Sequence, residues 1–311
     1  MPELILHHFP VSPFSEKLRL VLGYKRLDWV SVQIPAIAPK PDVVALTGGY
    51  RKTPLLQIGA DIYCDTALIC EVLEQIAPQP GLYPKPGEGL ARVVAQWADS
   101  SFFWAMIAGP RPEAHNFGGG AKESAQAFMD DRGAMFAGMQ RAQPQDAAAA
   151  RKSYLRRLSD MLHTNRYLLG DTPCIADFSV YHPLWFGRIR EPVQSDMLRE
   201  LPALGSWMDR MQAIGHGRSA PSTSAQAIAV AARSEPAGPG QGPLNDSEWI
   251  DEHGIAPGSM VSVTAESFGP EPSVGVLVSA TRAHYSLRRS DLRAGTVHVH
   301  FPRVGYVLNK V

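Results

Sequence analysis

Hydrophobic and polar positions change their spacing along residues 4–22. A short apolar run, LIL, is followed by a polar, proline-containing connection. One helical face beyond it carries the apolar residues Phe14, Leu18, Val21 and Leu22. This spacing predicts a strand, a tight connection and a helix. Pro13 suits the first helical position because the N–H that it lacks would have no partner there, so Ser12 is the predicted N-cap.

The predicted helix tip favours an anion. Backbone N–H groups near Ser12 lack helical partners, and the positive end of the helix dipole lies beside them. A thiolate is one anion that this environment stabilises. A serine before a proline is also an ordinary helix start, so the motif alone does not define a site.

Short elements of mixed type continue to about residue 78. The pattern predicts strands at 29–34, 52–58 and 62–64, a helical turn at 42–46 and a helix that opens at Asp65–Thr66. The apolar face of that helix is Leu68, Ile69, Val72, Leu73 and Ile76. The order strand, helix, strand, helical turn, strand, strand, helix is typical of a thioredoxin-like α/β domain.

Helical patterns dominate the middle of the chain and strand patterns its end. The predicted helices are at about 88–108, 121–140, 144–165, 175–188 and 201–214, with one more within 221–233. Residues 234–245 have the composition of a linker. The predicted strands beyond it are at 260–265, 274–280, 284–287, 296–301 and 304–308. We expect three domains: 1–80, an all-helical 88–233, and a small all-β barrel or sandwich at 246–311.

Composition narrows the class of protein. The chain has 311 residues, 45% of them hydrophobic, and can bury a substantial core. Thirty basic residues balance thirty acidic ones, which indicates neither a nucleic-acid partner nor an anionic membrane. No signal-peptide pattern is visible at the N-terminus, and no apolar run reaches about 18 residues. We expect a soluble, cytoplasmic protein.

Four motifs in register carry a resemblance to a known family. They are SPFSEKLRLVL at 12–22, RKTPLL at 51–56, IYCDT at 62–66 and GDTPCIADFSVY at 170–181. Together they resemble serine-type members of the glutathione S-transferase superfamily over residues 1 to about 230. The resemblance implies a thioredoxin-like glutathione-binding domain, an all-α second domain and a homodimer. Residues 246–311 resemble no family that we recognise.

The resemblance implies that Ser12 donates a hydrogen bond to the thiolate of bound glutathione. Disulfide-exchange proteins of this fold have Cys-Pro-x-Cys here, whereas Ser12 and Ser15 carry hydroxyls, so disulfide exchange by the protein itself is not expected. Lowering a thiol pKa by two units from about 8.5 stabilises the thiolate by about 2.7 kcal/mol. One charge-assisted hydrogen bond contributes about 1.5–3 kcal/mol, so a hydroxyl and the helix dipole can supply this. Ser15 as the donor and a plain helix cap are the alternatives.

The other motifs imply the remaining contacts with glutathione. In the family the proline that corresponds to Pro54 is cis, which turns the backbone of the preceding residue, Thr53 here, toward the peptide. Asp65–Thr66 matches the acidic residue and serine that hold the γ-glutamyl end. Arg51 and Lys52 are candidates to neutralise the glycyl carboxylate. The alternative interpretations are an edge-strand proline, an ordinary helix cap and exposed basic residues.

The electrophile is expected to bind between the two domains. Its candidate lining is Phe14, Phe103, Trp104 and Met106. Aromatic residues at such spacing are more often part of a core. Asp177, with Cys174 as N-cap, resembles a buried capping box and is expected to be structural. His298 and His300 share a strand face near His284 and could chelate a metal, but exposed strand histidines are the simpler interpretation.

The main hypothesis is a glutathione-dependent transferase. Glutathione is the expected co-substrate, no metal is expected, and the thiolate adds to an electrophilic or halogenated small molecule, a detoxifying reaction. The expected partners are this small molecule and a second copy of the chain, without nucleic acid or membrane. The second hypothesis is a non-catalytic binding or scaffold protein, because a fold alone does not establish catalysis. Thr53, Asp65 and Cys174 depart from the family pattern and favour it.

Overall fold

The computed structural model describes residues 2–108, 122–137, 139–140, 142–190, 198–250 and 252–311. Its first part comprises β1 (Ile5–His8), α1 (Pro13–Tyr24), β2 (Asp28–Gln33), α2 (Pro41–Thr47), β3 (Leu55–Ile58), β4 (Asp61–Cys64) and α3 (Thr66–Ile76). Strand β1 lies parallel to β2 and antiparallel to β3, which pairs antiparallel with β4. The thioredoxin-like order predicted from the sequence is confirmed.

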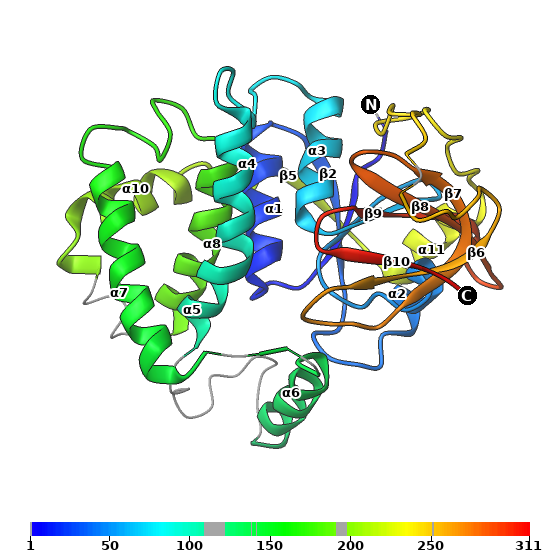
Figure 1. Cartoon of the computed structure of the whole chain (residues 1–311), viewed down its shortest axis with the longest axis horizontal. Helices are drawn as coiled ribbons and strands as arrows, with labels where there is room; N and C mark the ends of the chain where they lie inside the picture. Colours follow the sequence, from blue (N-terminus) through cyan, green and yellow to red (C-terminus); the bar gives the residue numbers. More distant parts are fainter. Residues whose placement is uncertain (1, 109–121, 138, 141, 191–197, 251) are drawn as a thin grey trace.

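The second part is helical; its helix α8 packs against α1, and α4 packs against α8 (Figure 1). It comprises α4 (Glu88–Trp97), a π-helical segment η1 (Ala98–Phe102), α5 (Phe103–Ile107), α6 (Lys122–Met135), α7 (Pro144–Met161), α8 (Ile175–Arg190) and α10 (Pro202–Gln212). The all-helical second domain is confirmed. The predicted long helix at 88–108 is continuous but contains η1, a device often found at functional positions.

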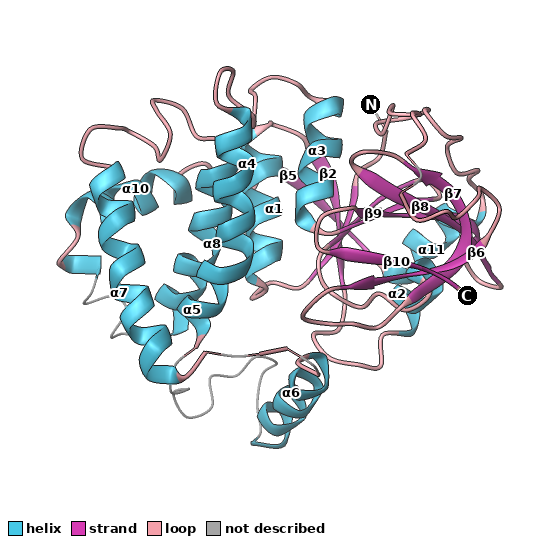
Figure 2. Cartoon of the chain, in the orientation of Figure 1, coloured by secondary structure: helices cyan, strands magenta, loops and turns pink. Residues whose placement is uncertain are grey.

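The third part returns to the first sheet, so the strands gather in one half of the molecule together with α2 and α11, and the helical domain forms the other half (Figure 2). It comprises β5 (Arg218–Ser222), α11 (Ser224–Ala232), β6 (Met260–Ala265), β7 (Ser273–Ala280), β8 (His284–Asp291), β9 (Gly295–Pro302) and β10 (Tyr306–Lys310). The five strands predicted beyond residue 246 are confirmed. Residues 218–232, which we predicted to lie in the helical domain, instead add β5 beside β2 and place α11 against the sheet.

One sheet runs through the first and third parts. Its ten strands have the order β10-β6-β7-β8-β9-β4-β3-β1-β2-β5. Without β9, strand β4 would be a sheet edge with unpaired N–H and C=O groups. Strand β9 covers it in parallel register, with Asp61 opposite His298 and Tyr63 opposite His300. Main-chain pairing therefore joins residues 260–311, which we call the C-terminal lobe, to the first domain.

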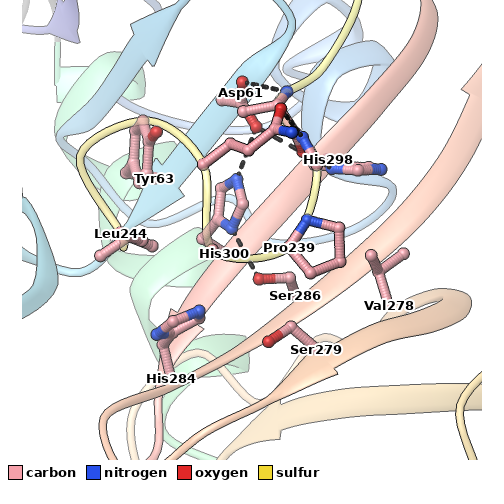
Figure 3. Close-up of a pocket in the computed structure, with 14 residues that line it drawn as sticks. Asp61, Tyr63, Pro239, Leu244, Val278, Ser279, His284, Ser286, His298 and His300 are labelled. Carbon is pink, nitrogen blue, oxygen red and sulfur yellow. Dashed lines mark hydrogen bonds and ion pairs between the residues drawn. The ribbon is translucent and has the colours of Figure 1, made fainter. Parts of the chain in front are cut away.

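A buried polar cluster lies where β4 meets β9 (Figure 3). His300 Nε2 donates to Asp61 Oδ1 at 2.9 Å, and its Nδ1 accepts from the Ser286 hydroxyl at 2.8 Å. The backbone N–H of Ala237 donates to Asp61 Oδ2, and the Ala237 carbonyl accepts from His298 Nδ1. The proline- and glycine-rich linker is thus tied across the joint between the two parts of the sheet.

The histidines of this cluster correct one prediction. His284, His298 and His300 are only 3%, 7% and 6% exposed, so the interpretation as exposed strand histidines is wrong. The segment Ala237–Leu244 covers the strand face that alternation alone assigned to solvent. The cavity between this segment and the strands is about 20 Å³, room for a single water molecule. Within the described ranges, no group of three or more His, Cys, Asp or Glu side chains is arranged to hold a metal ion.

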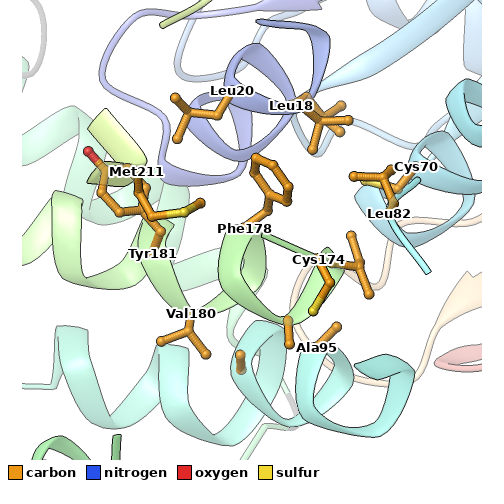
Figure 4. Packing of buried hydrophobic residues seen from close by; sticks show 14 of the residues in the cluster. Leu18, Leu20, Cys70, Leu82, Ala95, Cys174, Phe178, Val180, Tyr181 and Met211 are labelled. Carbon is orange, nitrogen blue, oxygen red and sulfur yellow. The ribbon is translucent and has the colours of Figure 1, made fainter. Parts of the chain in front are cut away.

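Hydrophobic clusters fill both faces of the sheet. On one face, α1 and α3 pack with the helical domain around Leu18, Phe178 and Met211 (Figure 4). On the other face, α2 and α11 meet the C-terminal strands, and Leu46 and Ile228 belong to that cluster. The first domain is therefore held between the helical domain and the C-terminal lobe. In the described part of the chain, every helix is too short or too polar to cross a membrane.

Candidate functional site

The tip of α1 has the geometry predicted for it. Ser12 is the N-cap, its Oγ accepts the Ser15 N–H at 3.2 Å, and Pro13 follows at the first helical position. Because the cap uses the oxygen as an acceptor, the hydroxyl proton of Ser12 is left to donate. Ser15 is fully buried, and among the described residues its Oγ has no hydrogen-bond partner. Ser12 itself is only 3% exposed.

The peptide bond between Thr53 and Pro54, directly before β3, is cis, as expected. Pro54 is buried and Thr53 is half-buried. The Lys40 Nζ donates to the Arg51 carbonyl at 3.1 Å and to Thr53 Oγ1 at 3.3 Å. Lys40 is a polar group of this site that the sequence analysis missed, because a lysine between two prolines carries no pattern of its own.

The tip of α3 is the second predicted anchor. Asp65 is its N-cap at φ +74°, and Asp65 Oδ1 accepts the Ala67 N–H at 2.9 Å. The hydroxyl of Thr66 accepts from Lys17 Nζ at 3.1 Å and is therefore free to donate its own proton. Since Lys17 belongs to α1, this contact links α1 to the tip of α3. Thr66 is 4% exposed.

Arg51 and Lys52, the basic pair before the cis proline, are half-buried and have partners within the protein. Arg51 is bonded by its Nε to Glu271 and by its Nη1 to Asp131 at 2.7 Å. The Lys52 Nζ lies 5.2 Å from the centre of the Tyr50 ring. Burial lowers the pKa of Lys52, although the charge of Asp65 opposes this shift.

Lys40 makes the stability of the protein depend on pH. Burial and then the charge of Arg132 lower the Lys40 pKa from 10.5 to about 7. Between these values the unfolded chain binds a proton at Lys40 that the folded protein lacks, so stability rises with pH across this window. We expect the free energy of unfolding of the wild type, minus that of Lys40→Met, to increase from pH 7 to pH 10.

Urea denaturation at several pH values measures this difference. The matched control is Lys152→Met, which removes an exposed lysine of α7 and should leave the pH profile unchanged. Parallel profiles for wild type and Lys40→Met would show that Lys40 titrates normally in the folded protein.

The predicted electrophile lining divides into two groups. Phe14 and Phe103 lie together at the domain boundary, with ring centres 4.8 Å apart, and Phe14 lies 4.5 Å from the His182 ring. Trp104 instead faces the C-terminal lobe, 5.2 Å from the ring of Phe268. The fourth residue, Met106, is 2% exposed and belongs to the hydrophobic core. Phe14 and Phe103 therefore remain together at the expected place, while the other two point elsewhere.

A charged cluster that the sequence did not reveal joins α1 to the helical domain. Lys17 Nζ contacts Asp99 Oδ2 at 2.5 Å, and His182 Nε2 donates to Asp99 Oδ1 at 2.9 Å. Burial alone raises the pKa of Asp99, but Lys17 and His182 outweigh it, so the pKa lies below its usual value. Asp99 lies in η1, and the irregular turn positions it between α1 and α8.

Asp177 has the contacts of a structural residue. Its carboxylate accepts the backbone N–H of Leu168 at 2.9 Å, the N–H of Cys174 at 3.0 Å and the Trp207 Nε1–H at 2.8 Å. The Cys174 thiol donates to the same carboxylate instead of acting as an acceptor. Asp177 is fully buried, as expected for a residue with a structural role.

A thioredoxin-like domain with a cis proline directly before β3 and capped helices α1 and α3, followed by a packed helical domain, defines a glutathione-transferase-type fold. The family profile for the glutathione S-transferase N-terminal domain matches residues 6–81, and the profile for the C-terminal domain matches residues 126–214. The chain belongs to the glutathione S-transferase family.

Individual relatives extend this assignment. A GST-like protein from Pseudomonas syringae is 41% identical, with a TM-score of 0.80 and coverage of 100% of both chains, so the similarity includes the C-terminal lobe. FtsZ-localized protein A from Caulobacter vibrioides is 33% identical over 105 residues, which are 32% of this chain and 46% of that protein. This chain thus matches about half the length of that relative. The beta-etherase LigF from Sphingobium sp. strain SYK-6, 19% identical with a TM-score of 0.50 over 68% of this chain and 95% of its own, shares the fold.

Proposed function

We propose that the protein is a glutathione-dependent transferase in which Ser12 stabilises the thiolate of the bound peptide. The observation that carries the proposal is the cap geometry of Ser12, whose oxygen is used by the Ser15 N–H while its proton stays available. The unpaired N–H groups at the start of α1 add a positive field at the same place. The thiolate sulfur then forms a bond to an electrophilic carbon, and a leaving group departs with the electron pair.

The rest of the site supports binding of the peptide. Thr66 can donate its hydroxyl proton to the γ-glutamyl carboxylate, while Lys17 behind it supplies positive charge. Thr53 and Pro54 offer backbone to the cysteinyl part, and Lys40 places a further donor beside Thr53. Phe14 and Phe103 are our candidates for the electrophile side. The homodimer, and the expectation that neither nucleic acid nor membrane is a partner, form part of the same proposal.

Replacing Ser12 by alanine tests the role of its hydroxyl. We expect the thiol pKa of bound glutathione to rise by about 1–2 units, the loss of one charge-assisted hydrogen bond, and conjugation near pH 6.5 to fall about 10- to 100-fold. Ultraviolet absorbance of the thiolate against pH measures the pKa, and conjugation of a chlorinated nitrobenzene measures the rate.

Thr223→Ala is the matched control, because Thr223 is an N-cap on α11 that lies outside this site. Both variants lose a helix cap of about 1 kcal/mol, but only Ser12→Ala should move the thiol pKa. An unchanged thiol pKa in the Ser12→Ala complex removes Ser12 from the mechanism, and a shift on Ser15→Ala instead assigns the role to Ser15.

The second candidate function is a non-catalytic binding or scaffold role. It is favoured by the burial of Ser12 and Thr66, at 3% and 4% exposure, and by the similarity to a relative named for its localisation with FtsZ. Calorimetry separates the candidates. Binding of glutathione at micromolar to low millimolar concentration, abolished by Thr66→Ala, supports the transferase; absence of binding at about ten millimolar, far above the millimolar range of weak specific binding, supports the scaffold role.

A further inference from the structure

The C-terminal lobe contacts both ends of the proposed peptide site. The Tyr306 hydroxyl, at the start of β10, donates to Asp65 Oδ2 at 3.0 Å. Glu271, between β6 and β7, accepts from Arg51 Nε. The Lys52 Nζ lies 4.9 Å from the centre of the Tyr306 ring. Tyr306 and Glu271 therefore contact residues that are expected to hold a ligand, although they lie 241 and 220 positions further along the chain than their partners.

These contacts have the chemistry of a peptide's two ends. The Glu271 carboxylate bonds to Arg51, a residue expected to neutralise a glycyl carboxylate. The Tyr306 hydroxyl donates a proton to Asp65, the residue expected to face an ammonium group. We infer that residues 266–272 together with Tyr306, which we call the plug, compete with glutathione for the site and must leave it before the peptide binds. This inference rests on the proposed function.

The two parts of the plug come from one end of the β6–β10 pair. Ala265, the last residue of β6, lies opposite Tyr306 in the antiparallel register, so the loop that follows β6 begins beside Tyr306. Within this loop Gly269 has φ +71° and donates its N–H to the Met135 carbonyl at 2.9 Å. A Cβ at Gly269 would lie 2.9 Å from Met135 Cε and 3.0 Å from Lys52 Cγ. Glycine thus allows the loop to approach both α6 and the basic pair.

An aromatic cluster fastens the plug to the helical domain. The Phe268 ring lies 5.2 Å from that of Trp104 and 4.9 Å from that of Phe136. Trp104 and Phe136 are also 5.3 Å apart, so the three rings form one cluster. Phe268, from the C-terminal lobe, therefore contacts Trp104, a residue of the helical domain that was expected to line the electrophile site.

The plug and the lobe behind it are held differently. The lobe is joined to the first domain by the β4–β9 ladder and the buried Asp61 cluster. The loop 266–272 is held by side chains and by two backbone bonds, from the Glu266 N–H to the Gly305 carbonyl and from the Gly269 N–H to the Met135 carbonyl, and its side chains Phe268 and Glu271 are half-buried. The backbone of Tyr306 belongs to the β6–β10 ladder, so only its side chain has to move. A segment with such contacts can open locally while the sheet stays paired. The closed fraction then reduces the apparent affinity for glutathione, because only the open fraction binds.

Calorimetry with reduced glutathione on the full chain tests the plug. The variants are Glu271→Gln, which removes the charge from the contact with Arg51, Tyr306→Phe, which removes the hydrogen bond to Asp65, and the double variant; each keeps the side-chain volume. We expect the double variant to bind glutathione at least about tenfold more tightly than wild type, since Tyr306→Phe removes one charge-assisted hydrogen bond that holds the plug and Glu271→Gln removes the charge from another. Phe268→Ala, which removes the aromatic fastening and no contact with the proposed ligand groups, is expected to act in the same direction.

Glu252→Gln and Tyr285→Phe are the matched controls, because Glu252 pairs with an arginine elsewhere and Tyr285 is a buried tyrosine of β8. Tighter binding in the plug variants alone supports the inference. Equal, measurable affinity in wild type and all plug variants overturns the inference and leaves the proposed function standing. No binding by any variant, with urea curves showing that each is folded, overturns the proposed function and the inference together.

Discussion

Asp177→Ala is expected to lower the free energy of unfolding by about 4 kcal/mol, because it leaves three buried N–H donors without an acceptor at about 1–3 kcal/mol each, partly relieved by water. The donors come from Leu168 and Cys174, nine and three residues before Asp177, and from Trp207, thirty residues after it. Urea denaturation followed by circular dichroism measures the change in midpoint and slope.

Asp171→Ala serves as the control for this variant, because Asp171 is an exposed carboxylate three residues before Cys174. Its effect should stay within about 0.5 kcal/mol, as for other surface substitutions. A loss below about 1 kcal/mol for Asp177→Ala would mean that the helical domain does not depend on this carboxylate, since one neutral hydrogen bond contributes that much.

Lys17→Met is expected to cost about 3 kcal/mol, because it leaves the Asp99 carboxylate at the domain boundary without its cation. Lys17 is fully buried, and the Asp99 side chain is 18% exposed. His182 still donates to Asp99, which limits the loss. Asp99→Leu in the same protein should recover part of the stability, because removing both charges of a buried pair costs less than removing one.

The control for this pair is the exposed Lys152→Met variant, which should be nearly neutral. The three measurements form a cycle with Lys17→Met, Asp99→Leu and the double variant. Additive losses would show that Lys17 and Asp99 do not stabilise one another. A double variant that is more stable than either single variant would show that the pair couples the two domains.

Local patterns predicted the first domain because each element carries its own signal. Phe14, Leu18, Val21 and Leu22 set the face of α1, and Pro13 sets its start. The predicted long helix from residue 88 contained η1, which no spacing revealed. Its reason is non-local: Asp99 meets a lysine of α1 and a histidine of α8, 82 and 83 positions away.

The candidate site was predicted in part. Ser12 as N-cap and the cis Thr53–Pro54 bond followed from a motif and a resemblance, and both are present. The contacts of Tyr306 and Glu271 were not predictable, because strand patterns after residue 246 state where strands lie and not which residues they meet. The same holds for the buried histidines, whose covering segment comes from the linker.

The sequence by itself determined the kinds of element, their order, the family and the helix tips at Ser12 and Asp65, because periodicity, proline and capping residues act within a few positions. Only the tertiary structure decided that β9 completes the sheet beside β4, that charges meet at Asp99, and that the C-terminal lobe reaches the proposed peptide site. Those outcomes depend on side chains that are far apart in the sequence, from Lys17 and Asp99 at a separation of 82 to Asp61 and His300 at a separation of 239. Chain-wide packing, not local propensity, selects such pairs.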